Sequence, residues 1–326
     1  MRVLLATDGS PSAMVATDLV GSSRWASGTT IDVVAVMDAA SVLPPPLSTL
    51  PADAQPLEDA LERHCRSAVE ETAEMLRALG LTVSSAVLIG RPTERLVQRA
   101  AETGADLVVC GSRGMGEFKA LLLGSVSAGL VDHAPCPVLV ARDRRVTRVL
   151  LADDGSASAL AAERIVARWP LFGRLPVDVL TVAAVHPALR SPFAMLPVGV
   201  ALAQYDVDVR EARERARAVN DGAMLRLEAE GRTVRRLLRE GDPASLIIGQ
   251  AKTSPDDLIV IGSHGYQGLD RLVLGSVSRA VLMHATASVL VVRASTGVVD
   301  ADVVDAEPEP MEEPTVEPDP TALVAV

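Results

Sequence analysis

The sequence is poor in aromatic residues and in cysteine. Only 2% of its 326 residues are Phe, Trp or Tyr, although 48% are apolar, so a core has to be built from Val, Leu, Ile and Ala. The three cysteines, Cys65, Cys110 and Cys136, are odd in number and form no C-x-x-C pair. This usage argues against a disulfide framework and a zinc site, and it favours free thiols in a reducing compartment.

Long hydrophobic runs are also missing. No apolar stretch approaches the roughly 18 residues that a membrane span needs. The chain starts "MRVLLATDGS", in which Asp8 follows the apolar residues too early for a secretory signal. We therefore expect a cytoplasmic protein without a membrane partner.

Basic residues are absent from the C-terminal segment. The net charge is −11, and the nine acidic residues between Asp300 and Val326, with no Lys or Arg among them, leave only −2 for the rest. Prolines interrupt this segment, and it cannot bury enough apolar surface to offset its ordering entropy. We expect residues 295–326 to form an acidic, Pro-rich, disordered tail. Acidity in the tail and near-neutrality elsewhere argue against nucleic-acid binding.

The remainder of the chain repeats itself. "RVLLATDGS", from Arg2, returns 146 positions later as "RVLLADDGS", from Arg148. "ADLVVCGSRG" and "CPVLVAR" return as "DDLIVIGSHG" and "ASVLVVR", now 151 positions later. The sequence thus predicts an internal duplication into domains 1–142 and 147–294, with five residues added after the second strand of the second copy.

Short Val/Leu/Ile runs alternate with helical patterns in each repeat. Helical spacing of apolar residues covers residues 58–80 and 91–104, and both stretches end at a glycine. The runs are apolar on both faces, as strands covered by helices must be. The alternation predicts an α/β fold, Rossmann-like, with a doubly wound parallel five-stranded sheet in each repeat. The strands expected in the first repeat are Val3–Ala6, Asp32–Val36, Val83–Leu88, Leu107–Cys110 and Val138–Val140.

A glycine-containing loop occurs once in each repeat. "GSRGMGEFKALLLGS" (Gly111 to Ser125) and "GSHGYQGLDRLVLGS" (Gly262 to Ser276) share the spacing G-x2-G-x9-G-S, while most intervening residues differ. A helix is expected to follow the final Gly-Ser, where free backbone N–H groups and the helix dipole favour anions. Glycines admit phosphate close to the backbone, and Ser125 and Ser127 can add hydroxyl donors. The plainer alternative, that the glycines only end strands and cap helices, fits one such loop better than two.

Other nucleotide and hydrolase motifs are missing. There is no G-x-x-x-x-G-K-S/T, no G-x-G-x-x-G after a first strand, and no G-x-S-x-G nucleophile elbow.

The two loops resemble those of tandem universal stress proteins of the ATP-binding type, whose hallmark is G-x2-G-x9-G-S/T. The resemblance covers residues 1–142 and 147–294. It implies sheets of order 3-2-1-4-5, of the adenine nucleotide alpha hydrolase-like type, with ATP where strands one and four part. Mg²⁺, if present, would arrive with the nucleotide. It also implies that the last strands, Val138–Val140 and Val289–Val291, pair to form an intramolecular pseudo-dimer, with a homodimer as a further option.

The resemblance also implies individual contacts. An Asp closing the first strand touches the nucleotide, and backbone at the end of the second strand holds the adenine. Together with the loop residues, the nucleotide-binding candidates are Asp8, Val36, Gly111, Arg113, Gly114, Gly124, Ser125, Val126 and Ser127 in the first repeat, and Asp154, Val182, Gly262, His264, Gly265, Gly275, Ser276, Val277 and Ser278 in the second.

Several residues keep two interpretations at this stage. Arg113 and His264 could pair with phosphate or be exposed loop residues. Cys110 could sense redox state or be a buried thiol. The pair Asp153-Asp154 could hold a metal, but only the second Asp is shared with Thr7-Asp8. His133 and His284 are matched near helix ends, where a dipole contact would explain both.

Three functions fit these features. Lys119 and Lys252 are the only lysines, and neither is matched in the other repeat, so no lysine for phosphoryl transfer is shared. The favoured function is a nucleotide-binding regulatory protein of the stress response. A slow ATPase, and a scaffold whose acidic tail recruits partners around structural ATP, are the alternatives.

Overall fold

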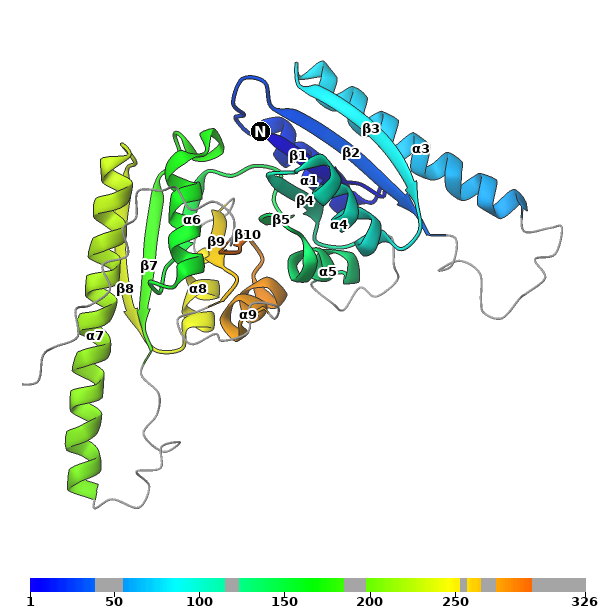
Figure 1. Cartoon of the computed structure of the whole chain (residues 1–326). Helices are drawn as coiled ribbons and strands as arrows, with labels where there is room; N and C mark the ends of the chain where they lie inside the picture. The colour runs from blue at the N-terminus through cyan, green and yellow to red at the C-terminus, as the bar shows by residue number, and fades with distance from the viewer. Residues whose placement is uncertain (39–54, 115–122, 185–197, 253–256, 265–273, 295–326) are drawn as a thin grey trace, which may run out of the picture. The chain divides into compact units, whose positions relative to one another are not determined.

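Strands and helices alternate along the chain in the computed structural model (Figure 1). It describes residues 1–38, 55–114, 123–184, 198–252, 257–264 and 274–294. The tail expected at residues 295–326 lies outside the described residues.

The two repeats contain equivalent sets of elements. The strands of the first repeat are β1 (Arg2–Ala6), β2 (Thr30–Met37), β3 (Thr82–Ile89), β4 (Leu107–Gly111) and β5 (Val138–Ala141), and its helices are α1 (Pro11–Ser22), α3 (Gln55–Ala78), α4 (Pro92–Thr103) and α5 (Ser125–His133). The second repeat has strands β6 (Arg148–Ala152), β7 (Val177–Ala183), β8 (Val234–Glu240), β9 (Asp257–Gly262) and β10 (Ser288–Val292). Its helices are α6 (Ala157–Arg168), the 3-10 turn η1 (Pro170–Phe172), α7 (Val198–Ala229), α8 (Pro243–Ala251) and α9 (Ser276–His284).

The strands form one mainly parallel sheet of ten strands in the order β3-β2-β1-β4-β5-β10-β9-β6-β7-β8. The α/β fold is confirmed, and each repeat has the expected order 3-2-1-4-5. The predicted pairing of the last strands joins the two five-stranded sheets into one, because β5 and β10 pair antiparallel, with Leu139 opposite Leu290. Each strand thereby supplies backbone partners for an edge that would otherwise be open.

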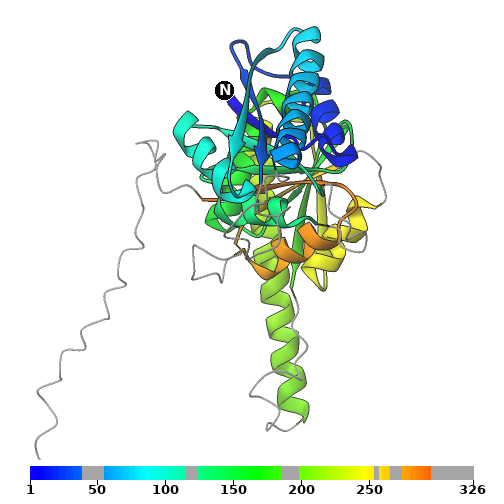
Figure 2. The ribbon, with the colours of Figure 1, turned by 90° about the vertical axis from the view of Figure 1, so that its right-hand side faces the viewer.

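Helices cover both faces of the sheet, and two apolar clusters fill the space beneath them. One cluster joins α1, α3, α6 and α7 to side chains such as Leu5, and the other joins α4, α5, α8 and α9 to side chains such as Leu4. Successive side chains of a strand point to opposite faces, so β1 contributes to both clusters. Figures 1 and 2 show the helices in these two layers.

The outer strands differ from the expected pattern. Ser84 and Ser85 of β3 are exposed, and so are Arg235 and Arg236 of β8. These strands lie at the ends of the sheet, where the helices cover them incompletely, so the expectation that every strand is apolar on both faces is wrong for them.

The five additional residues of the second repeat lie between β7 and the middle of α7. Met37 and Ala183, which end β2 and β7, are 146 positions apart. Ala68 of α3 and Val219 of α7, which face Gly9 and Gly155, are already 151 apart. The described α7 has 32 residues against 24 in α3, so the insertion lies in the crossover and not in the core.

None of the described helices is both long and apolar enough to cross a lipid bilayer.

Candidate functional site

The loop after the first strand is built alike in both repeats. Gly9 has a φ of +75°, which favours glycine, and the Ser10 N–H donates to Asp8 Oδ1 at 3.0 Å. In the second repeat Gly155 has a φ of +77°, and the Ser156 N–H donates to Asp154 Oδ1 at 3.0 Å. Ser10 and Ser156 in turn cap α1 and α6. The two predicted carboxylates therefore occupy equivalent, fixed positions at the carboxyl edge of the sheet.

The first glycine of each loop allows a close approach between protein segments. A Cβ on Gly111, at the end of β4, would lie 2.6 Å from the backbone of Ser12 in α1. A Cβ on Gly262 would lie 2.4 Å from Ser158 Oγ in α6. Packing of α1 on β4 and of α6 on β9 thus accounts for these two glycines, a reason that differs from the phosphate contact expected for them.

The third glycine of each loop begins a helix. The Gly124 N–H donates to the Ser112 carbonyl and the Gly275 N–H to the Ser263 carbonyl, both at 2.8 Å. Each glycine is the N-cap of its helix and supplies no side-chain acceptor to the N–H groups of the first turn. This is the arrangement of an anion site at a helix N-terminus.

The space beside Gly124 is not crowded by any residue that the structure describes. Its φ is −79°, which any residue adopts, and a Cβ would meet nothing closer than Arg113 Cα at 3.4 Å, an ordinary contact. Gly275 has a φ of −60°. Neither backbone strain nor crowding by the described part of the chain explains the glycine at position 124.

The serine hydroxyl groups that follow these glycines differ in their surroundings: one in each repeat is bonded to a strand carbonyl, and the other is exposed. Ser127 Oγ donates to the Gly111 carbonyl at 2.7 Å, and Ser278 Oγ donates to the Gly262 carbonyl at 2.6 Å. Both side chains are buried, so their protons tie the helices to β4 and β9, and Ser127 is not free to act as the expected phosphate donor. Ser125 and Ser276 are exposed at the first turn.

The second glycine and the strand ends complete the predicted set. Gly114 is exposed, and a Cβ there would lie 2.7 Å from Asp8 Oδ2, so the start of the loop lies against the predicted carboxylate. Val36 and Val182 are half-buried at the carboxyl ends of β2 and β7. The equivalent glycine of the second repeat, Gly265, lies outside the described residues.

Ser12 and Ser158 are site residues that the sequence analysis missed. The Arg113 N–H donates to Ser12 Oγ at 3.1 Å, and the His264 N–H donates to Ser158 Oγ at 3.3 Å. These bonds join the glycine loop to the helix after the first strand. The signal was available, because "DGSPS" and "DGSAS" carry the two serines at the repeat spacing of 146.

Arg113 and His264 occupy equivalent positions with different surroundings. Arg113 is exposed. His264 is half-buried, its Nδ1 lies 2.9 Å from Ser263 Oγ, and its buried Nε2 has no hydrogen-bond partner among the described residues. Arg113 is thus open to solvent and His264 is partly enclosed, and both positions stay candidates for a phosphate contact.

A buried acidic pair closes β6 of the second repeat and has no counterpart at the equivalent described positions of the first. Asp153 is 3% exposed, and burial together with the charge of Glu163 raises the pKa of its carboxyl group. Glu163 is bound by both arms of Arg226, at 2.7 and 2.8 Å. Thr7 and Thr17 stand at the equivalent positions of the first repeat. Within the described ranges no three acidic, His or Cys side chains gather as metal ligands do.

Cys110 lies beneath the loop and not in it. The side chain is 4% exposed, and desolvation raises the pKa of its thiol to about 12. A thiol held in the neutral form is a poor nucleophile, which favours the structural interpretation over redox sensing.

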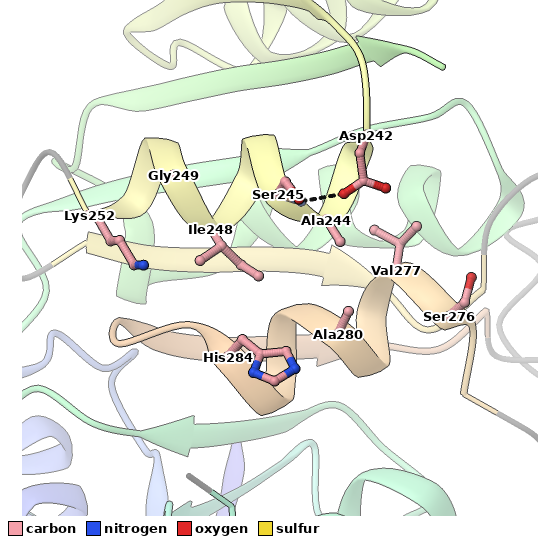
Figure 3. A pocket seen from close by; sticks show the side chains of 10 residues that line it. All are labelled: Asp242, Ala244, Ser245, Ile248, Gly249, Lys252, Ser276, Val277, Ala280 and His284. Atoms are coloured by element: carbon pink, nitrogen blue, oxygen red, sulfur yellow. Dashed lines mark hydrogen bonds between the residues drawn. The ribbon is translucent and has the colours of Figure 1, made fainter. Parts of the chain in front are cut away.

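A groove of about 600 Å³ adjoins the predicted site of the second repeat. Figure 3 shows it between α8 and α9, with Ser276 and Val277 at one end and Lys252 at the other. Of the predicted residues only Ser276 and Val277 line it. The groove therefore meets the predicted site at the first turn of α9, and Lys252 is remote from that turn.

Comparison with known proteins decides the family. The model of the universal stress protein family matches residues 1–142 and again residues 145–293. The chain belongs to the universal stress protein family. A universal stress protein of Mycolicibacterium smegmatis is 31% identical over 245 residues, which are 71% of this chain and 78% of that protein. One from Thermus aquaticus is 37% identical over 142 residues, 43% of this chain and 97% of its own length.

A solved structure shares the fold across both repeats. The crystal structure of a universal stress protein from Archaeoglobus fulgidus covers 90% of this chain and 98% of its own, with a TM-score of 0.58 and 21% identity. At this identity the likeness shows the fold of a tandem universal stress protein and leaves the ligand to be argued from the residues.

Proposed function

We propose that this universal stress protein binds ATP at two sites, one in each repeat, and that its nucleotide-bound state is the regulatory signal. The observation that carries the proposal is the start of α5 and α9. Both helices begin at a glycine that gives the first-turn N–H groups no side-chain acceptor, and the backbone conformation of both glycines suits any residue. At Gly124, where a Cβ would make only ordinary contacts with the described residues, room for phosphate is the reason for glycine that we propose.

The residues around the helix N-terminus suit the rest of a nucleotide. Backbone N–H groups of Ser125, Val126 and their equivalents Ser276 and Val277 would hold phosphate oxygens. Asp8 and Asp154 are acceptors and repel phosphate, so they fit the ribose hydroxyl groups. The backbone near Val36 and Val182 would hold the adenine. Arg113 and His264 would lie beside the phosphate groups of the bound nucleotide.

Binding is favoured over hydrolysis. Phosphoryl transfer needs a positioned nucleophile and concentrated positive charge on the leaving phosphates. Lys252 lies at the far end of the groove from the first turn of α9 (Figure 3). A metal ion would have to be brought by the phosphates themselves.

The nucleotide carried by the purified protein tests this proposal. Native mass spectrometry should find ATP, and calorimetric titration of the stripped chain should give two ATP per chain. ADP in place of ATP would support the slow ATPase. A chain that carries and binds no adenine nucleotide would contradict the proposal and favour a scaffold.

We propose further that residues 1–142 and 147–294 act as two domains of a pseudo-dimer joined through β5 and β10. Leu139 and Leu290, which face each other in this pair, are fully buried. Burying an aliphatic side chain of this kind contributes about 1.5–3 kcal/mol. The pairing covers both apolar strands without a second chain.

A further inference from the structure

Two arginines reach across the boundary between β5 and β10. Arg142 follows β5, and its guanidinium donates to the Leu282 carbonyl at 2.6 Å and to the Ala287 carbonyl at 3.3 Å. Arg293 follows β10 and donates to the Val131 carbonyl at 2.8 Å. The side chain of each arginine thus donates hydrogen bonds to backbone carbonyl groups of the other repeat.

The bonds from Arg142 to Leu282 and from Arg293 to Val131 join equivalent residues of the two repeats. Arg142 and Arg293 are 151 positions apart, and so are their carbonyl partners Val131 and Leu282. An accidental surface contact would not recur at the repeat spacing. Both arginines are half-buried, and desolvation lowers the pKa of Arg142 to about 10 and lowers that of Arg293. Each guanidinium is therefore held away from water by what it binds.

The helices that these arginines bind are α5 and α9. Val131 and Leu282 lie in their last turns, where the final carbonyl groups lack partners within the helix. A cation at this end stabilises the helix and offsets the negative end of its dipole. The other end of each helix, about 13 Å away at 1.5 Å per residue, is the Gly-Ser turn of the proposed phosphate site.

We infer that Arg142 and Arg293 are positioning residues for the nucleotide sites of the opposite repeats: Arg142 holds α9 for the second site, and Arg293 holds α5 for the first. The inference rests on the proposed ATP binding. By holding the last turn of its helix, each arginine fixes the direction in which the first-turn N–H groups point. Neither site is complete in an isolated repeat.

The boundary has other bonds that keep it together when a guanidinium is removed. The Arg142 N–H donates to Ser288 Oγ at 3.0 Å, and the Ser288 N–H donates to Asp143 Oδ2 at 3.1 Å. The first bond uses only the backbone of residue 142, and the second involves no atom of that residue, so neither depends on the arginine side chain. Replacing the Arg142 side chain by methionine, which keeps most of the apolar stem, therefore leaves the strand ends in register.

The test measures each site alone. In the Gly124→Val background only the second site remains, and in the Gly275→Val background only the first. Arg142→Met should weaken ATP binding about three- to tenfold at the second site and leave the first within about twofold. Arg293→Met should give the reverse. Arg142→Lys, which restores the charge, should recover part of the loss.

The matched control is Arg144→Met. Arg144 lies between the repeats, is exposed and pairs with Asp18 of the first repeat, so the same loss of charge two residues away should change neither site. Equal weakening of both sites by Arg142→Met, or weakening of the first site alone, would overturn the inference.

Amide hydrogen exchange of the nucleotide-free chain separates this inference from the proposed function. Arg142→Met should speed exchange in α9 and not in α5, whether or not ATP binds. Unchanged exchange in α9 would overturn the inference. A wild-type chain that binds no ATP but shows the crosswise exchange pattern would overturn the proposed function and the positioning role, and would leave the arginines as helix caps.

Discussion

Glycine serves two purposes in the repeated loops. At Gly111 and Gly262 a side chain would collide with α1 or α6, so these glycines belong to the packing of the fold. At Gly124 a Cβ would make only ordinary contacts with the described residues, which is why we propose that glycine there leaves room for phosphate. Mutations at the first kind of position should therefore lower stability, and mutations at the second kind should remove nucleotide binding.

Replacing Gly124 or Gly275 by valine should remove one nucleotide site and keep the fold. The added side chain would occupy the space in which phosphate meets the helix N-terminus. Titration calorimetry should show the ATP stoichiometry falling from two to one for each single variant and to zero for the double variant. Circular dichroism should remain that of the wild type.

Gly111→Val is the control for this prediction. Its Cβ would lie 2.6 Å from the Ser12 backbone, so this variant should lower the melting temperature. Full ATP binding by the double variant at positions 124 and 275 would contradict the phosphate role of these glycines.

At the scale of elements, charged side chains meet where β6 ends against its two covering helices, while the equivalent positions of the first repeat are the neutral Thr7 and Thr17. Asp153, Glu163 and Arg226 come from the end of β6, from α6 and from α7. Burial of Asp153 and the neighbouring Glu163 charge both oppose ionisation, and the pKa of Asp153 is raised to about 7. The first repeat, with Thr7 and Thr17, has no such titration at the equivalent place.

The Asp153 carboxyl should make stability depend on pH between about 4 and 7. In this window the folded chain keeps a proton that the unfolded chain has released, so stability falls as the pH rises and levels off above 7. Asp153→Asn cannot ionise. Its melting temperature relative to the wild type should therefore be higher at pH 8 than at pH 5, by roughly 3 °C or more.

Asp206→Asn provides the comparison, because it removes the same charge from an exposed position of α7 that does not act on Asp153. Its difference from the wild type should be the same at both pH values. A melting difference for Asp153→Asn that does not change between pH 5 and pH 8 would contradict the raised pKa.

The pairing of β5 with β10 can be tested by a disulfide. Leu139 and Leu290 are opposed in the antiparallel register, where cross-strand Cβ atoms lie about 4.5–5.5 Å apart, close enough for a disulfide after a small adjustment. Leu139→Cys with Leu290→Cys should therefore crosslink within one chain on mild oxidation and migrate faster on a non-reducing gel. The single variants should not. A crosslinked dimer of chains would contradict the intramolecular pseudo-dimer.

At the scale of the whole molecule, charge and folded structure are distributed differently along the chain. Residues 300–326 hold nine of the acidic groups, while the two repeats that precede them are nearly neutral. The packed clusters on both faces of the sheet consist of residues from the two repeats.

Deleting residues 300–326 should leave folding and ATP affinity nearly unchanged. The net charge moves from −11 to −2, while the described core keeps all its members. The melting temperature should change by less than about 1 °C, and the truncated chain should elute from an anion exchanger at lower salt. A melting temperature lowered by several degrees would mean that the tail stabilises the repeats.

The sequence by itself determined the features that depend on periodicity and repetition. Strand-helix alternation and the duplication follow from patterns along the chain, the strand order was implied by the family resemblance of the loops, and the structure agrees. The G-x2-G-x9-G-S spacing located the two helix starts at Gly124 and Gly275 correctly. These features are local or repeated, so each can be read from a stretch of chain or from its copy.

Only the tertiary structure decided what each residue of the site does. The reason for Gly111 is the backbone of Ser12, about 100 residues earlier, and the proton of Ser127 is taken by the Gly111 carbonyl. The partners of Arg142 lie in the other repeat, although the matched "VAR" and "VVR" endings were visible in the sequence. A contact between distant segments depends on how the sheet brings them together, and the spacing of residues along the chain does not give their distance in space.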